Sequence, residues 1–159
     1  MLATNLLFEQ FDRDLRRRAS MPTTYYEVLV RLSEAPGRRL RMSDLADRSQ
    51  SSRSRLSHTV TRLERTGWVR RETCPTDLRG AFAVLTDAGF DALVAAAPIH
   101  VESVRTHLFD QLDRHQLEEL RSVSERILEH LITIQDRPPS ESDLLGDLTG
   151  RHPISDTAT

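Results

Sequence analysis

The sequence of 159 residues contains no lysine, a single cysteine and no long run of apolar residues. One cysteine, Cys74, excludes an intramolecular disulfide framework and is typical of proteins of the reducing cytoplasm. No segment reaches the roughly 18 consecutive apolar residues of a membrane span, and the N-terminus lacks the apolar core of a signal peptide. We therefore expect a cytoplasmic protein with one domain, or with one domain and a tail.

Motifs of catalysis are absent as well. The chain has no G-x-S-x-G, P-loop or H-E-x-x-H motif, and no cysteine and histidine at a useful spacing. Cys74 could act as a redox sensor, and His100 and His107, with Glu102 and His115 nearby, could ligate a metal. Histidines on the surface of an amphipathic helix are the commoner explanation, so we expect no metal site. Because catalytic motifs are missing, we also expect no enzyme activity and no cofactor.

Positive charge is concentrated in one part of the chain. All 22 basic residues are arginine, and the formal net charge is −2. From Arg38 to Arg79, however, eleven arginines outnumber five acidic residues and give a local charge of +6, whereas the remainder carries −8. A basic block inside an acidic chain is typical of a surface that binds nucleic acid.

The centre of the basic block, residues 51–67, is predicted to be one short helix. Ser52 can cap its N-terminus with the hydroxyl oxygen, and Gly67 can adopt the left-handed conformation that ends many helices. A narrow apolar stripe at helical spacing is formed by Leu56, Val60 and Leu63. The outer face carries Arg53, Ser54, Arg55, Ser57, His58, Thr61, Arg62 and Arg65. A helix face that carries several arginines and no acidic residue favours phosphates and base edges as partners. The alternative interpretation is a helix whose outer face is simply exposed to solvent.

The preceding segments predict three further helices. Apolar periodicity indicates helices at residues 4–18 and 23–34, and a short extended piece follows at 38–41. Ser43 would then cap a small helix at 44–48. This small helix and the basic helix are joined by a short polar turn, so the pair is predicted to form a helix-turn-helix.

A β-hairpin is predicted directly after the basic helix. Short strands at residues 68–73 and 81–85 flank a longer loop at 74–80, which contains turn-forming residues. A hairpin in this position is a wing. Its tip carries one arginine, Arg79.

Two long helices follow, at residues 87–109 and 113–135, and Pro98 predicts a kink in the first of them. Their apolar stripes are longer than one winged domain can cover, so we expect burial against a second copy of the chain. The segment from Asp136 onward is rich in proline, serine and aspartate and is expected to be disordered. The predicted organisation is N-terminal helices (1–34), a winged helix-turn-helix domain (35–86), dimerisation helices (87–135) and a tail (136–159).

Three motifs carry a resemblance to a known family. They are the run Thr-Arg-Leu-Glu-Arg-Thr-Gly-Trp-Val at 61–69, Asp77-x-Arg79 in the wing, and Val84-Leu85-Thr86-x-x-Gly89 before the first long helix. In this order, and with helices before and after, the chain resembles the MarR family of bacterial transcription regulators over about residues 5–135. The fold class expected is mainly α with a small β-hairpin wing, a winged helix-turn-helix domain joined to a helical dimerisation region.

The resemblance implies a homodimer on a palindromic DNA operator, with half-sites about one helical turn, roughly 34–36 Å, apart. Each basic helix would enter a major groove, where its arginines and histidine would meet base edges or phosphates and its hydroxyls would donate to phosphate oxygens. Arg79 would reach a minor groove, and Asp77 would orient it or form the turn. The implied DNA-binding residues are Ser52, Arg53, Ser54, Arg55, Ser57, His58, Thr61, Arg62, Asp77 and Arg79.

A small aromatic or amphipathic effector is also implied. It would bind between the DNA-binding and dimerisation regions and release a repressor from its operator. The aromatic residues considered for this site are Phe11, Tyr25, Tyr26 and Phe90, most of which could equally belong to the core. Two alternatives stay open: an architectural DNA-binding protein without an effector, and a redox- or metal-responsive regulator of the same fold.

Overall fold

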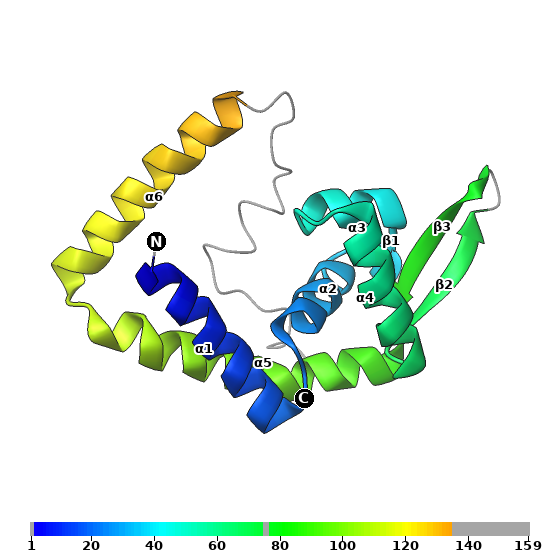
Figure 1. Ribbon diagram of the computed structural model, residues 1–159, viewed down its shortest axis with the longest axis horizontal. Helices are drawn as coiled ribbons and strands as arrows, with labels where there is room; N and C mark the ends of the chain where they lie inside the picture. Colours follow the sequence, from blue (N-terminus) through cyan, green and yellow to red (C-terminus); the bar gives the residue numbers. More distant parts are fainter. Residues whose placement is uncertain (1, 75–76, 135–159) are drawn as a thin grey trace, which may run out of the picture. The chain divides into compact units, whose positions relative to one another are not determined.

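The computed structural model describes residues 2–74 and 77–134, so the tail expected at 136–159 lies outside the described residues (Figure 1). The chain divides into two compact units, Met1–Ser103 and Val104–Thr159, and we describe each by itself. Across the described ranges, no helix is long and apolar enough to cross a membrane.

Helices dominate the described residues, and the elements follow the predicted order. The helices are α1 (Leu2–Ala19), α2 (Thr23–Ser33), α3 (Met42–Arg48), α4 (Arg53–Arg65), α5 (Asp87–His107) and α6 (Arg114–Ile134). The strands are β1 (Arg39–Arg41), β2 (Val69–Cys74) and β3 (Asp77–Leu85), and 3₁₀ turns lie at Pro36–Arg38 and Phe109–Gln111. The mainly α class with a small wing is thus confirmed. α5 continues through Pro98 as one helix, and the kink expected there stays a prediction.

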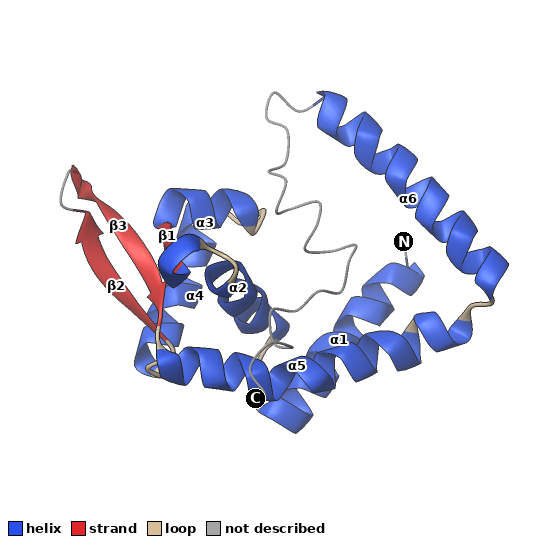
Figure 2. Ribbon diagram, turned by 180° about the vertical axis from the view of Figure 1, so that it is seen from behind, coloured by secondary structure: helices blue, strands red, loops and turns tan. Residues whose placement is uncertain are grey.

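β3 is the central strand of a three-stranded antiparallel sheet with the order β1-β3-β2 (red in Figure 2). β1, which was expected only as an extended piece, pairs with β3 so that Leu40 lies opposite Ala83. The prediction of a long loop at residues 74–80 is wrong, because the strands extend into this segment. β2 continues to Cys74 and β3 begins at Asp77, beyond a register shift after Thr73. Such an irregularity lets a ladder continue past residues that usually mark a turn.

α2 lies at the centre of the first unit, in contact with α1, α3, α4, β1 and β3. The apolar side chains that are fully buried in this core include Leu15, Met21, Leu29, Leu32, Leu45, Leu56, Val60, Leu63 and Val69. Burying one leucine contributes roughly 1.5–3 kcal/mol relative to leaving it exposed. The apolar stripe predicted for α4 is therefore the side by which this helix is held to the core.

Local hydrogen bonds fix both ends of α4. At the N-terminus, the Arg55 backbone N–H donates to Ser52 Oγ at 3.3 Å, which confirms the predicted cap. At the C-terminus, Gly67 has a φ of +77°, and the Trp68 N–H donates to the Leu63 carbonyl at 3.1 Å. This is the Schellman geometry that the glycine predicted.

The cap expected at Ser43 is wrong. α3 begins at Met42, so Ser43 lies in its first turn and its hydroxyl donates to a carboxylate oxygen of Asp44 at 3.1 Å. Arg41 occupies the N-cap position with extended backbone and no side-chain cap. Because β1 ends at Arg41 and leads directly into α3, the chain has no separate capping residue there.

The wing joins α5 through Thr86 and Gly89. The Thr86 N–H donates to the Trp68 carbonyl at 3.1 Å, and the Thr86 hydroxyl donates to the Gly67 carbonyl at 2.7 Å. The Gly89 N–H donates to Thr86 Oγ1 at 3.0 Å, so Thr86 caps α5. A Cβ atom at position 89 would lie 2.1 Å from the Trp68 carbonyl oxygen, so only glycine allows this close approach.

The second unit contains the end of α5 and the whole of α6. Asp113 and Gln116 form a capping box at the start of α6, in which each side chain accepts the other residue's backbone N–H at 2.9 Å. Arg121 and Glu125 form an ion pair at 2.8 Å on the exposed surface. The large apolar side chains left exposed on α6 are Leu120, Val123, Ile127, Leu128 and Leu131. An exposed apolar stripe of this kind is typical of a surface that binds a partner.

Candidate nucleic-acid interface

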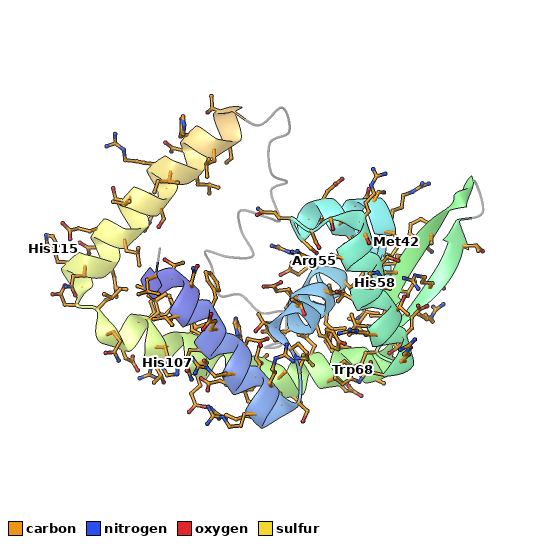
Figure 3. The ribbon with its side chains drawn as sticks, viewed as in Figure 1. Met42, Arg55, His58, Trp68, His107 and His115 are labelled. Carbon is orange, nitrogen blue, oxygen red and sulfur yellow. The ribbon has the colours of Figure 1, made fainter. Side chains whose placement is uncertain are left out.

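The outer face of α4 is exposed and basic, and Figure 3 labels Arg55 and His58 on it. The opposite side is anchored by Leu56, Val60 and Leu63, whose exposed fractions are 1%, 0% and 0%. Of the residues predicted to bind DNA, those exposed on or beside this helix are Ser52, Arg53, Ser54, Arg55, Ser57, His58 and Arg62, whereas Thr61 is half-buried. None of them is acidic, so the face favours an anionic partner.

A hollow of about 600 Å³ lies between α4 and the first turn of α2. Thr24 and Tyr25 line it from α2, and the α4 side is lined by Ser52, Ser54, Arg55, His58, Thr59 and Arg62. Small-molecule pockets are lined mostly by apolar side chains, whereas this hollow is lined by hydroxyls, an imidazole and two guanidinium groups. Its chemistry suits an anionic group.

Arg71 of β2 links the wing to α4. Its guanidinium donates to the Ser57 carbonyl at 3.0 Å, to Thr61 Oγ1 at 3.1 Å and to one carboxylate oxygen of Glu64. The Arg71 backbone N–H donates to the other Glu64 oxygen at 3.1 Å. Charge-assisted hydrogen bonds of this kind are short and directional. They fix the wing strand against two turns of α4.

This network changes the role expected for Thr61. The Thr61 hydroxyl donates to the Ser57 carbonyl at 2.9 Å and accepts from Arg71, so its proton is already used within the protein. Ser52 differs, because its Oγ accepts the Arg55 N–H and its own proton can still go to a partner. Thr61 therefore helps to hold the wing strand against α4.

Arg71→Ala is expected to lower the free energy of unfolding by about 1–2 kcal/mol, because it leaves the half-buried Glu64 carboxylate without its cation. The measurement is urea unfolding followed by circular dichroism. Arg70→Ala is the matched control, because the Arg70 side chain is more exposed than that of Arg71. Within the described part of the chain, Arg70 forms one ion pair, with Glu72. The control should change stability by less than about 0.5 kcal/mol, and equal effects of the two variants would contradict the network's role.

Comparison with known proteins identifies the family. A family model described as MarR family matches residues 19–80. The crystal structure of Sco3205, a MarR family transcriptional regulator from Streptomyces coelicolor in complex with DNA, is 50% identical, has a TM-score of 0.75 and is matched over 81% of each chain. The chain belongs to the MarR family of transcription regulators.

Two further transcriptional regulators are similar to the chain. The crystal structure of AbsC, a MarR family transcriptional regulator from Streptomyces coelicolor, is 46% identical with a TM-score of 0.74, over 81% of this chain and 86% of that one. The transcriptional regulator HosA of Escherichia coli O111:H- is 35% identical over 74 residues, which are 46% of this chain. The match spans about half the length of that curated relative, 53%.

The wing residues of this MarR-family chain are described only in their backbone. Asp77 and Arg79 belong to the first residues of β3, and Cys74 ends β2. The side chains of all three lie outside the described part of the structure. The roles expected for Asp77 and Arg79 in the minor groove, and for Cys74 as a redox sensor, therefore stay predictions.

The four aromatic residues considered for an effector do not gather at one place. Phe11 and Tyr26 are buried, and their rings lie 6.1 and 4.6 Å from that of His100. Tyr25 instead lines the hollow beside α4. The ring of Phe90 stacks under the guanidinium of Arg38, whose Cζ lies 3.9 Å from the ring centre. Among the described residues, no group of three or more histidine, cysteine, aspartate or glutamate side chains could hold a metal ion.

Two titratable groups near the start of α2 have shifted pKa values. Burial, and then the charge of Glu34, raise the pKa of Tyr26 to about 12. Asp12 of α1 accepts the Thr23 N–H at 2.9 Å. Desolvation raises the pKa of Asp12, but hydrogen bonds from Arg16 and Thr23 outweigh it, so the pKa is lowered and the carboxylate stays charged. This carboxylate fixes the first turn of α2.

Sequence reasoning missed Arg71 and the α2 side of the hollow. A signal for Arg71 existed, because Glu64 is the one acidic residue of α4 and a nearby arginine on the next strand could pair with it. For Thr24 and Tyr25 no comparable signal existed. Their position beside α4 depends on how α2 packs, which local patterns do not determine.

Proposed function

We propose that this protein is a homodimeric, sequence-specific DNA-binding transcription regulator that represses from a palindromic operator. The observation that carries the proposal is the outer face of α4, which is capped, exposed and free of acidic residues. The relative Sco3205, at 50% identity, was crystallised in complex with DNA, which supports DNA as the partner of this chain.

Three residues of α4 are proposed to meet base edges or the phosphates that line the major groove. Arg55, His58 and Arg62 are spaced three and four residues apart, so they follow one line along the helix. A helix in a major groove presents such a line to successive bases, and arginine contacts to guanine O6 and N7 are the commonest specific pairing. Arg79 of the wing is proposed for the flanking minor groove, with Asp77 orienting it.

A second copy of the chain is proposed to cover the apolar side of α6. Leu120, Val123, Ile127 and Leu131 lie on one stripe, and each is at least two-fifths exposed in the single chain. The ion pairs of α6 lie between charged residues four apart, as is typical of a solvent-facing side. A self-complementary helical stripe is the common basis of two-fold symmetric dimers, and two-fold symmetry requires a palindromic site.

Release from the operator is proposed to follow binding of a small aromatic or amphipathic effector. Support comes from membership of the family and from the cluster of Phe11, Tyr26 and His100, where α1, α2 and α5 meet. An effector that prefers one spacing of the two recognition helices would shift the protein towards it. Thermal stabilisation by a compound, together with loss of operator binding at the same concentration, would test this step.

Arg55→Ala is expected to weaken operator binding by about 1–3 kcal/mol and to relax preference at one base pair of each half-site. The measurement is the Kd for the operator and for its single-base variants. Arg65→Ala is the matched control, because Arg65 is also exposed on α4 but does not line the hollow. The control should keep the sequence preference intact. If Arg55→Ala weakens binding to all sequences equally, Arg55 does not read a base.

A further inference from the structure

We propose that α2 takes part in DNA binding: a backbone phosphate occupies the hollow between α2 and α4, where Thr24 and Tyr25 contact it opposite Arg62. The inference rests on the proposed function. It adds a contact that lies outside both the helix-turn-helix and the wing, on a helix that otherwise belongs to the core.

The α4 side of the hollow supplies positive charge. Arg55 and Arg62 lie two turns apart, and both line the hollow together with His58. A guanidinium group presents a planar fork of donors that matches two phosphate oxygens. No acidic residue lines the hollow to compete for these donors. The occupant is therefore an anion with several acceptor oxygens.

The α2 side supplies neutral donors that are held in position. Thr24 and Tyr25 lie in the first turn of α2, where the helix dipole favours negative charge. The turn is fixed by the Asp12 carboxylate, which accepts the Thr23 N–H at 2.9 Å, and by the Tyr25 N–H, which donates to the Pro22 carbonyl at 2.9 Å. A donor set that is already ordered loses little entropy when a phosphate binds.

The lining distinguishes a DNA phosphate from a small effector. Effector pockets are mostly apolar, whereas the one large apolar ring among the residues that line this hollow is that of Tyr25. A volume of about 600 Å³ holds a phosphodiester with part of its sugars. When a helix lies in a major groove, the two phosphate backbones border it on either side, so an element packed beside that helix meets one backbone. α2 is such an element for α4.

The test combines removal of single side-chain hydroxyls with neutralisation of single phosphates in the DNA backbone. Tyr25→Phe and Thr24→Val each remove one hydroxyl, and Thr106→Val, exposed on α5, is the matched control. Each protein is titrated against operator DNA in which one phosphate per half-site at a time is replaced by an uncharged methylphosphonate. We expect Tyr25→Phe to bind operator and unrelated DNA about tenfold more weakly, because phosphate contacts carry no sequence information. Thr106→Val should bind as the wild type does.

The decisive readout is the coupling between variant and phosphate. At one phosphate of each half-site, the methylphosphonate should weaken the wild type about tenfold and the Tyr25→Phe variant by less than about twofold. Additive losses at every phosphate would overturn the inference while leaving the proposed function intact. A wild type that binds no DNA would instead refute the proposed function.

Discussion

Gly89→Ala is expected to lower the free energy of unfolding by about 3 kcal/mol or more, because the new methyl group has no room. It would lie 2.1 Å from the Trp68 carbonyl oxygen and 2.9 Å from Leu85 Cδ1. Backbone atoms cannot move aside as a flexible side chain can, so the wing base and the first turn of α5 must separate. That movement would also strain the Thr86 hydrogen bonds to Trp68 and Gly67.

The measurement for Gly89→Ala is urea unfolding, with Gly67→Ala as the matched control. Gly67 has a φ of +77°, but a Cβ atom there meets nothing within 4 Å. The control therefore introduces backbone strain alone and should cost about 1–2 kcal/mol. A Gly89→Ala variant as stable as the control would show that the junction is looser than the structure describes.

Ile127→Glu is expected to convert the proposed dimer to a monomer and to weaken operator binding at least about 100-fold. Ile127 is 55% exposed in the single chain, so the substitution leaves the fold of the protomer intact. In the proposed dimer, the carboxylate would be buried without a partner. Losing the second protomer also removes the second half-site contact, which is the larger part of the loss in affinity.

Light scattering after size-exclusion chromatography, together with titration of operator DNA, measures both effects. Ser122→Glu adds the same charge to the opposite side of α6, where Ser122 is exposed, and should remain dimeric. A dimeric Ile127→Glu variant would show that this stripe is not the interface. Dissociation of both variants would show that charge on α6, rather than burial of the stripe, controls assembly.

The features that could be predicted from sequence are those determined by neighbouring residues. Ser52 and Gly67 fix the ends of α4 through hydrogen bonds between residues at most five positions apart along the chain, so their chemistry is visible locally. The apolar stripe of α4 is equally local, and all three of its residues are buried as expected. The exposed basic face follows from that stripe, because a helix with one side buried presents the other side to solvent.

The features that escaped prediction depend on segments far apart in the sequence. The pairing of β1 with β3 joins residues that are more than forty positions apart, and a three-residue strand has no periodicity that would reveal it. The hollow needs α2 and α4 side by side. Ser43 shows the opposite error, in which a good capping residue lies inside the helix because the preceding strand determines where α3 begins.

The most direct test of sequence-specific recognition is the affinity of the purified protein for DNA from upstream of its own gene and for a scrambled duplex of the same composition. Both are titrated across salt concentrations from about 50 to 200 mM. We predict that the upstream DNA is bound about 10³-fold or more tightly than the scrambled duplex at every salt concentration. Equal affinity for both, falling steeply with salt, would contradict the account and favour an architectural DNA-binding protein.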